Sequence, residues 1–157
     1  MVIHYICRGN AFRSIIADAY TKSLGIPGLE VISSGTAASD YREDNIPTYA
    51  RVCALLASHE LKEFTKDHYA DDLTQQRIDR SDVVVCLNEI VLTEAASKWK
   101  LPKQTYVWDI ADIGESEHVP EGETEHRAFM EATYQAITAR VDSLVHTASL
   151  LAKLAQQ

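Results

Sequence analysis

Residues 7–14 of the chain, Cys-Arg-Gly-Asn-Ala-Phe-Arg-Ser, combine a nucleophilic sulfur with groups that bind anions. Cys7 ends an apolar run, and five residues separate it from Arg13. The backbone N–H groups of such a short loop, together with the N-terminus of a following helix, can surround a tetrahedral oxyanion. The planar guanidinium of Arg13 can bind two oxygens of that anion. The spacing therefore predicts attack of the cysteine sulfur on phosphorus.

An electropositive loop favours the thiolate form of Cys7, because the loop's donors stabilise the negative sulfur. Ser14 can donate a hydrogen bond to that thiolate and later help the sulfur to leave. Gly9 can adopt a positive φ angle, and Asn10 is among the residues that tolerate one. The residues expected to contact the phosphate group are Arg8, Gly9, Asn10, Ala11, Phe12, Arg13 and Ser14.

Strand-like and helix-like segments alternate along the chain, which predicts an α/β fold with a parallel sheet between layers of helices. The last helix has the clearest pattern, since its apolar residues recur at steps of three and four from Ile137 to Leu154. Strands are expected at residues 2–7, 29–33, 82–87 and 104–109, and helices at about 12–24, 47–58, 75–80, 89–98 and from 125–129 onward.

Several polar residues follow predicted strands at their carboxyl ends, where parallel sheets place their sites. In addition to Cys7, these are Ser34, Asn88 and two aspartates, Asp109 and Asp112. Phosphoryl transfer needs a proton for the leaving oxygen, and a carboxyl group can supply it and later activate water. Asp112 is the preferred acid, and Asp109 is the alternative.

Residues 7–14 resemble the signature of the low-molecular-weight protein tyrosine phosphatases, which usually reads Cys-x-Gly-Asn-x-Cys-Arg-Ser. The resemblance implies a four-stranded parallel sheet flanked by helices. It also implies phosphotyrosine hydrolysis through a cysteinyl phosphate, with no cofactor and no metal. Further segments that resemble the family are residues 33–36, 68–74, 81–88 and 108–112.

The resemblance also implies supporting residues around the loop. In the family, a serine and a histidine hold the asparagine of the loop, and here Ser34 and His68 are the candidates, with His59 as the other histidine considered. The family has a carboxylate after its third strand, where this chain has Asn88. Tyr41 can stack on a substrate ring.

Three departures from the family pattern affect the site. The family's acid precedes a proline and an aromatic residue, but Ile113 and Gly114 follow Asp112 here. Phe12 replaces the second cysteine of the loop, so the nucleophile lacks its usual disulfide partner. Ala11 stands where related phosphoarginine phosphatases carry a threonine.

Size and charge limit the function classes. The 157 residues fit one domain, residues 1–157, and 46 % hydrophobic content is ordinary for a water-soluble protein. The formal net charge of −8 disfavours nucleic acid as a partner. No signal peptide or membrane-spanning stretch is recognised, and three irregularly spaced cysteines indicate a reducing compartment, the cytoplasm. The expected partner is a phosphorylated protein or a small phosphate ester, and the oligomeric state is left open.

Two other functions fit the same motif. Arsenate reduction on this fold needs resolving cysteines, and Cys86 within the third strand is poorly placed for that purpose. A phosphate-binding module without turnover is the second alternative, because the acid loop and the third-strand carboxylate depart from the family pattern. The sequence also leaves open whether phosphotyrosine, phosphoarginine or a small ester is preferred.

Overall fold

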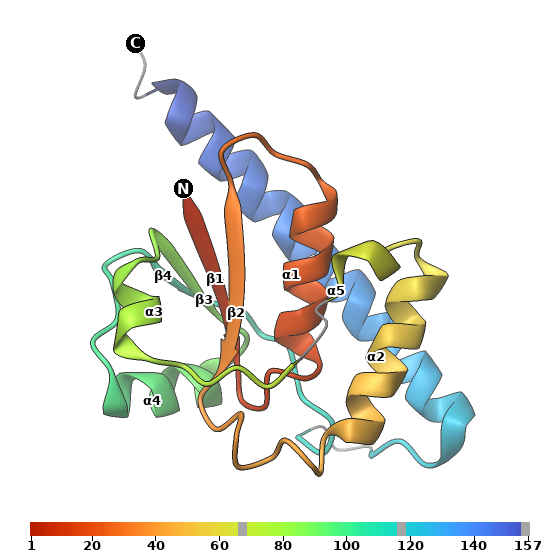
Figure 1. Ribbon diagram of the computed structural model, residues 1–157. Coiled ribbons are helices and arrows are strands. Elements are labelled where there is room, and N and C mark those ends of the chain that lie inside the picture. Colours follow the sequence, from red (N-terminus) through yellow and green to blue (C-terminus); the bar gives the residue numbers. More distant parts are fainter. Residues whose placement is uncertain (66–68, 116–118, 155–157) are drawn as a thin grey trace.

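A sheet of four parallel strands forms the centre of the fold (Figure 1). The computed structural model describes residues 1–65, 69–115 and 119–154, and side chains as far as residue 148. The strands lie in the order β2-β1-β3-β4, which confirms the predicted fold class. Their bounds are β1 Val2–Cys7, β2 Glu30–Gly35, β3 Val83–Cys86 and β4 Thr105–Val107.

Helices cover both faces of this sheet (Figure 1). The larger core cluster joins one face to α1, α2 and α5, and a smaller cluster joins the other face to α3 and α4. Strand β1 shows the alternation behind the two clusters, because Tyr5 and Cys7 belong to the first and Ile6 to the second. The helices are α1 Arg13–Ser23, α2 Ile46–Ser58, α3 Gln75–Asp79, α4 Glu89–Lys98 and α5 Gly122–Leu154, with a short 3-10 helix η1 Lys62–Phe64.

Most predicted elements lie within two residues of those observed, and the differences have local causes. Helix α5 begins at Gly122, before the expected 125–129, and Glu123 and Glu125 in its first turn complement the helix dipole. Strand β2 continues to Gly35 because its last residues still pair with β1, Cys7 opposite Gly35. Strand β4 is shorter than expected; it is an edge strand that pairs with β3 alone among the described strands.

The topology places Cys7 at a switch point of the sheet. The chain leaves β1 for β2 on one side, and β3 lies on the other side of β1. In open α/β sheets the crevice at such a point, beyond the carboxyl ends of the strands, is where ligands bind. In Figure 1 these ends point toward the lower part of the view, where the loops after β1 and β2 run.

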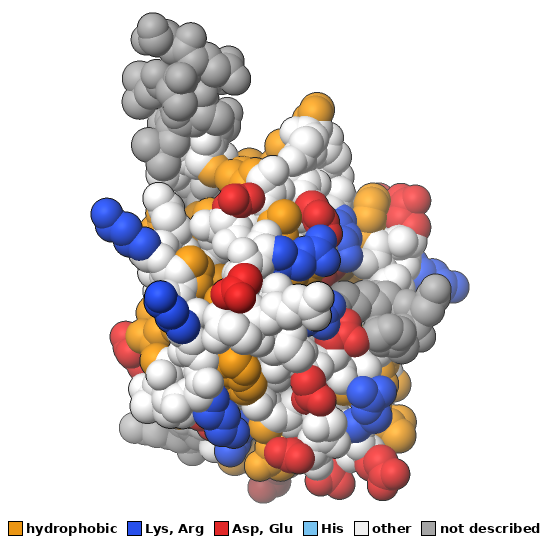
Figure 2. Space-filling view, turned by 60° about the vertical axis from the view of Figure 1, so that its left-hand side comes forward, with side chains coloured by type: hydrophobic (Ala, Val, Ile, Leu, Met, Phe, Trp, Pro, Cys, Tyr) orange, Lys and Arg blue, Asp and Glu red, His pale blue; other side chains and the backbone are white. Residues whose placement is uncertain are grey.

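The surface carries charges of both signs. Figure 2 shows basic and acidic side chains interspersed over one face, with apolar side chains between them. Within the described ranges, no helix combines the length and the apolar character needed to cross a bilayer.

Candidate active site

The loop after β1 folds around the sulfur of Cys7, which is buried. The backbone N–H of Asn10 donates a hydrogen bond to Cys7 Sγ at 3.2 Å. The hydroxyl oxygen of Ser14, in the first turn of α1, lies 2.9 Å from the same sulfur. Both contacts favour a negative sulfur, and the N-terminus of α1 adds to that effect.

Asn10 organises this loop. Its φ angle is +49°, in the left-handed region where asparagine is enriched among non-glycine residues. Its side-chain oxygen accepts a hydrogen bond from the backbone N–H of Asp71 at 3.0 Å, which fixes the orientation of the amide. Its Nδ2 donates to Ser14 Oγ at 2.9 Å and to Ser33 Oγ at 3.1 Å. Because the Ser14 oxygen accepts from Asn10, the Ser14 hydroxyl hydrogen can point to the sulfur.

The serine that binds Asn10 is Ser33, and the expectation that Ser34 would do so is corrected. Successive side chains of a strand point to opposite faces of the sheet. Ser33 pairs with Tyr5 and shares the face of α1, whereas Ser34 pairs with Ile6 and lies on the other face. There the Ser34 hydroxyl is hydrogen-bonded to the buried His4 ring at 2.9 Å.

Two glycines allow the loop to pack closely. Gly35 lies so near the loop that an added Cβ would be 2.5 Å from the Arg8 carbonyl oxygen and 2.9 Å from the Asn10 nitrogen. At Gly9 a Cβ would be 2.4 Å from Nδ2 of Asn45. Gly9 does not have a positive φ, and its close neighbour is the end of a side chain; the left-handed residue of the loop is Asn10.

Arg13 begins α1, and its side chain is only 1 % exposed. Nη1 donates to the backbone oxygen of Ile110 at 2.8 Å, and Nη2 donates to Oδ2 of Asp112 at 3.0 Å. The third donor, Nε, is buried and has no hydrogen-bond partner among the described residues. A buried donor without a partner is costly, so this atom favours an anionic ligand beside Cys7.

Of the two candidate acids, Asp112 is the one that reaches the site. It contacts Arg13, lines the same cavity as Cys7, and its side chain is 30 % exposed. Asp109 is exposed on the loop after β4, between the buried residues Trp108 and Ile110. The position of Asp112 supports its preference over Asp109 as the proton donor.

Asn88 lies at the carboxyl end of β3, as expected, and connects to a residue that sequence reasoning missed. Its Nδ2 donates to Oε2 of Glu115 at 2.7 Å. The same Glu115 oxygen accepts from the backbone N–H of Asp112 at 3.0 Å and lies 3.8 Å from Nη1 of Arg13. A carboxylate therefore lies beside Arg13 although position 88 lacks one. In the sequence, Glu115 is indistinguishable from its acidic neighbours.

A small cavity of about 190 Å³ opens over the loop. Asn45 and Thr48, at the start of α2, form one wall and were not foreseen, although Pro47 marks a helix N-terminus there. Phe12 packs against Phe129 of α5, with ring centroids 6.2 Å apart. The described residues around the cavity are Cys7, Gly9, Ala11, Phe12, Arg13, Asn45, Thr48, Asp112 and Ile113.

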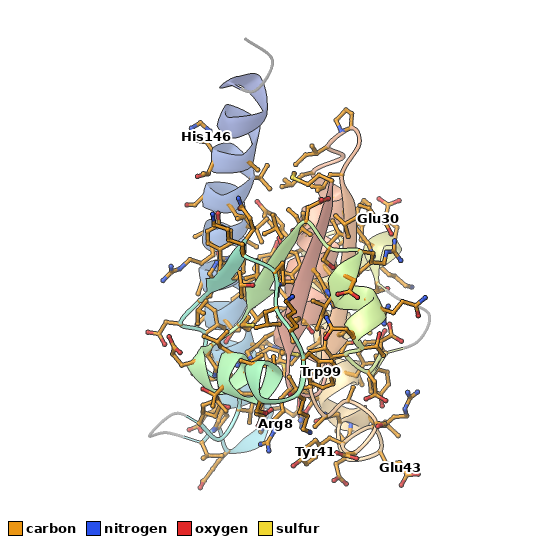
Figure 3. All side chains as sticks on the ribbon, turned by 90° about the vertical axis from the view of Figure 1, so that its left-hand side faces the viewer. Arg8, Glu30, Tyr41, Glu43, Trp99 and His146 are labelled. Carbon is orange, nitrogen blue, oxygen red and sulfur yellow. The ribbon has the colours of Figure 1, made fainter. Side chains whose placement is uncertain are left out.

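Arg8 and Tyr41 are not among the described residues that line this cavity. The guanidinium of Arg8 lies 5.2 Å from the centre of the Tyr41 ring and forms an ion pair with Glu94 at 3.2 Å. Figure 3 shows both labelled side chains close together, far from Glu30 at the start of β2. Tyr41 therefore stacks on Arg8 in this structure.

A histidine was expected to hold Asn10, with His68 as the candidate and His59 as the other histidine considered. His68 lies outside the described residues. The other histidine considered, His59, stacks on Tyr134 and hydrogen-bonds Glu131 of α5 at 2.9 Å.

The three cysteines are reduced, and they differ in environment. Burial raises the pKa of the Cys86 thiol to about 12, with a smaller contribution from Glu89. Cys86 belongs to the cluster on the α3/α4 face, whereas Cys7 belongs to the cluster on the α1 face. The two sulfurs are therefore separated by the sheet. Cys53 is half-buried in α2.

Cys7 and Arg13 thus line one small cavity at the switch point of a parallel sheet. A family profile described as low molecular weight phosphotyrosine protein phosphatase matches residues 2–156. The chain belongs to this family, as the resemblance in the sequence indicated.

Solved structures agree with this fold. The low molecular weight protein tyrosine phosphatase from T. tengcongensis superimposes with a TM-score of 0.71 at 17 % identity, over 94 % of this chain and 99 % of that one. Wzb of Vibrio vulnificus, in complex with benzylphosphonate, gives 0.68 at 17 % identity, over 90 % and 97 %. The Drosophila arginine phosphatase DARP gives 0.67 at 18 % identity, over 94 % and 97 %. A search of curated protein sequences gave no significant match.

Proposed function

We propose that this protein is a phosphatase that hydrolyses phosphotyrosine or a related phosphorylated residue through a phosphate ester of Cys7. The observation that carries the proposal is the pairing of the hydrogen-bonded Cys7 sulfur with the unpartnered Nε of Arg13 around one cavity. Family membership supports the same chemistry.

In the first step the Cys7 thiolate attacks phosphorus, an S–P bond forms, and the bond from phosphorus to the leaving oxygen breaks. Arg13 and the loop N–H groups neutralise the charge on the remaining oxygens. Asp112 takes a proton from the solvent once its carboxylate leaves Arg13, and it gives that proton to the leaving oxygen. Before this step, an oxygen of the phosphate must replace the Asp112 carboxylate on Nη2 of Arg13, because that carboxylate accepts from the same donor.

In the second step water attacks phosphorus, and Asp112 takes a proton from that water. The S–P bond breaks, inorganic phosphate leaves, and the thiolate is restored. Ser14 stabilises the departing sulfur through its 2.9 Å contact. The proton that Asp112 gives in the first step is returned to it in the second, and water is the co-reactant.

Phosphotyrosine is the first substrate to test, and phosphoarginine is the second. The family includes tyrosine phosphatases, and structures with the same fold include arginine phosphatases. The polar wall of Asn45 and Thr48 favours a leaving group that can form hydrogen bonds, which phosphoarginine has. The ratio of kcat/KM for phosphotyrosine and phosphoarginine peptides measures the preference.

Phosphorylated proteins or small phosphate esters are the proposed partners, in a reducing compartment such as the cytoplasm. Arsenate reduction is disfavoured by the position of Cys86, which is buried on the other face of the sheet from Cys7. A phosphate-binding module without turnover would form the cysteinyl phosphate at Cys7 and hydrolyse it only slowly.

The decisive experiment compares the unmodified protein with Cys7→Ser. The unmodified protein should hydrolyse p-nitrophenyl phosphate over many turnovers, and Cys7→Ser should not, while it still binds inorganic phosphate. Full activity of Cys7→Ser would reject the nucleophile. A single burst followed by no turnover would favour the binding module.

A further inference from the structure

Glu115 touches three parts of the site through one oxygen atom. Oε2 accepts hydrogen bonds from Nδ2 of Asn88 at 2.7 Å and from the backbone N–H of Asp112 at 3.0 Å. It also lies 3.8 Å from Nη1 of Arg13. The Glu115 side chain is 23 % exposed. This one oxygen therefore links the end of β3, the acid loop and the guanidinium.

We propose that Glu115 is a positioning residue that holds the backbone of Asp112 in place for proton transfer, and that Asn88 holds Glu115. The inference rests on the proposed phosphatase function. Glu115 and Asn88 then align the acid. Neither residue belongs to the motif at residues 7–14 or is hydrogen-bonded to the nucleophile.

Asn88 is a rigid support for this contact. Its Oδ1 accepts a hydrogen bond from the backbone N–H of Val91 at 3.0 Å and caps the N-terminus of α4. The neighbouring Leu87 accepts a hydrogen bond from the N–H of Ile110 at 3.0 Å. The N–H of Trp108 likewise donates to the carbonyl oxygen of Cys86 at 2.9 Å. The loop after β4 is therefore attached to the end of β3 at several points, and the one nearest to Asp112 is the contact through Glu115.

The attachment matters when the site is filled. The Asp112 carboxylate accepts from Nη2 of Arg13 through Oδ2 and from the backbone N–H of Ile113 through Oδ1, at 3.0 and 2.9 Å. A phosphate oxygen that takes Nη2 frees Oδ2, the carboxylate oxygen that can then turn to the leaving group. The hydrogen bond to Glu115 Oε2 comes from the backbone N–H of Asp112, so it can persist while the Asp112 side chain turns to the leaving oxygen. Without it, the acid would lose its position at the moment of reaction, and misplacement by about 1 Å can cost about 10²-fold in rate.

The test uses the dependence of kcat/KM on the leaving group, because kcat/KM reports only the transfer to Cys7. Glu115→Ala should lower kcat/KM for phenyl phosphate by about 10- to 100-fold. The same variant should lower it by less than about threefold for 2,4-dinitrophenyl phosphate, whose leaving oxygen needs little help from an acid. The plot of log kcat/KM against leaving-group basicity should become steeper.

Two further variants separate positioning from charge. Glu115→Gln keeps an oxygen that can accept from the Asp112 N–H, so it should retain activity on phenyl phosphate within about threefold. Asn88→Asp keeps the cap of α4 but replaces the donor to Glu115 by a carboxylate, so it should show the same steeper plot as Glu115→Ala. Glu121→Gln, an exposed charge change before α5, is the matched control.

An equal loss of kcat/KM for all leaving groups, or no loss, would overturn the proposal. Failure of Glu115→Gln to retain activity would show that the charge matters and would also overturn it. These results differ from a failure of the phosphatase function itself, in which the unmodified protein would hydrolyse none of the aryl phosphates.

Discussion

Arg13 and Asp112 are hydrogen-bonded to each other, with Nη2 and Oδ2 3.0 Å apart. The groups proposed to bind the phosphate and to protonate the leaving oxygen are thus direct partners. Their contact must break in each catalytic cycle. Phosphate binding would therefore displace Oδ2 of Asp112 from the guanidinium, while Oδ1 keeps its hydrogen bond from the N–H of Ile113.

Asp112→Ala should separate binding from catalysis. Loss of the acid should lower kcat/KM for phenyl phosphate by about 10²- to 10³-fold. Inorganic phosphate should bind more tightly, by up to about fivefold, because a partly exposed ion pair that competes for Arg13 is worth up to about 1 kcal/mol. Inhibition constants for phosphate measure the second effect. If Asp109→Ala lowers activity on poor leaving groups instead, the acid has been wrongly assigned.

Arg13→Lys should weaken phosphate binding although it preserves the charge. A lysine cannot offer Nε and Nη2 together as a planar fork. Loss of one hydrogen bond to a charged group, about 1.5–3 kcal/mol, corresponds to roughly 10- to 150-fold in the dissociation constant. Isothermal titration with phosphate gives this value. Arg51→Lys, at an exposed arginine bonded to Glu123, is the control and should bind phosphate normally.

Gly35→Ala should lower activity although Gly35 does not line the cavity. The added methyl group would meet two backbone atoms of the loop, the Arg8 oxygen at 2.5 Å and the Asn10 nitrogen at 2.9 Å, so the loop itself must shift. We expect kcat to fall by about 10²-fold.

Gly9→Ala is the matched comparison for that variant. Its methyl group would meet the end of the Asn45 side chain, so the loss should be smaller, and the double variant with Asn45→Ala should recover activity. Equal losses at Gly35 and Gly9 would argue against close packing as the reason for Gly35.

The two buried thiols should react very differently. The raised pKa of Cys86, about 12, keeps its thiol protonated between pH 7 and 9, since ionisation occurs only well above that range. Iodoacetate should therefore modify Cys7 and leave Cys86 intact, and phosphate should protect Cys7. Peptide mass spectrometry distinguishes the sites, and denaturation should expose Cys86 as a control. Rapid labelling of Cys86 in the folded protein would contradict its assigned burial.

Oxidation by peroxide should inactivate the protein without recovery by dithiothreitol. Phe12 takes the place of a second loop thiol, so oxidised Cys7 has no neighbouring sulfur in residues 8–14 and can proceed to sulfinic acid. Phe12→Cys should allow recovery, as measured by activity after reduction. Because Phe12 is buried against Phe129, that variant should also lose about 2–4 kcal/mol of stability.

Sequence reasoning identified the loop because its residues are neighbours in the chain. Cys7, Asn10, Arg13 and Ser14 lie within eight positions, and a strand before them and a helix after them nearly determine their geometry. The sheet could also be predicted, since apolar runs alternate with helical periodicity. Asp112 was expected near this edge because it follows a strand that ends there, and its role as the acid stays a prediction.

Contacts between distant segments could not be predicted in the same way. Which of Ser33 and Ser34 faces Asn10 depends on the pairing of β2 with β1. The contact of Glu115 with Asn88 joins residues 27 positions apart and depends on the path of the loop after β4. In an acidic segment, nothing local distinguishes this glutamate from the others.

The contacts of Arg13 span almost two thirds of the chain, 97 residues to Ile110 and 99 to Asp112, and Asn10 reaches Asp71 across 61. A synthetic fragment that carries only the first twenty residues would contain the whole signature but lack the partners that shape it. Tight phosphate binding therefore requires the loop after β4 to be in place beside Arg13. Recovery of that binding during refolding would serve as a signal that the entire chain has reached its native arrangement.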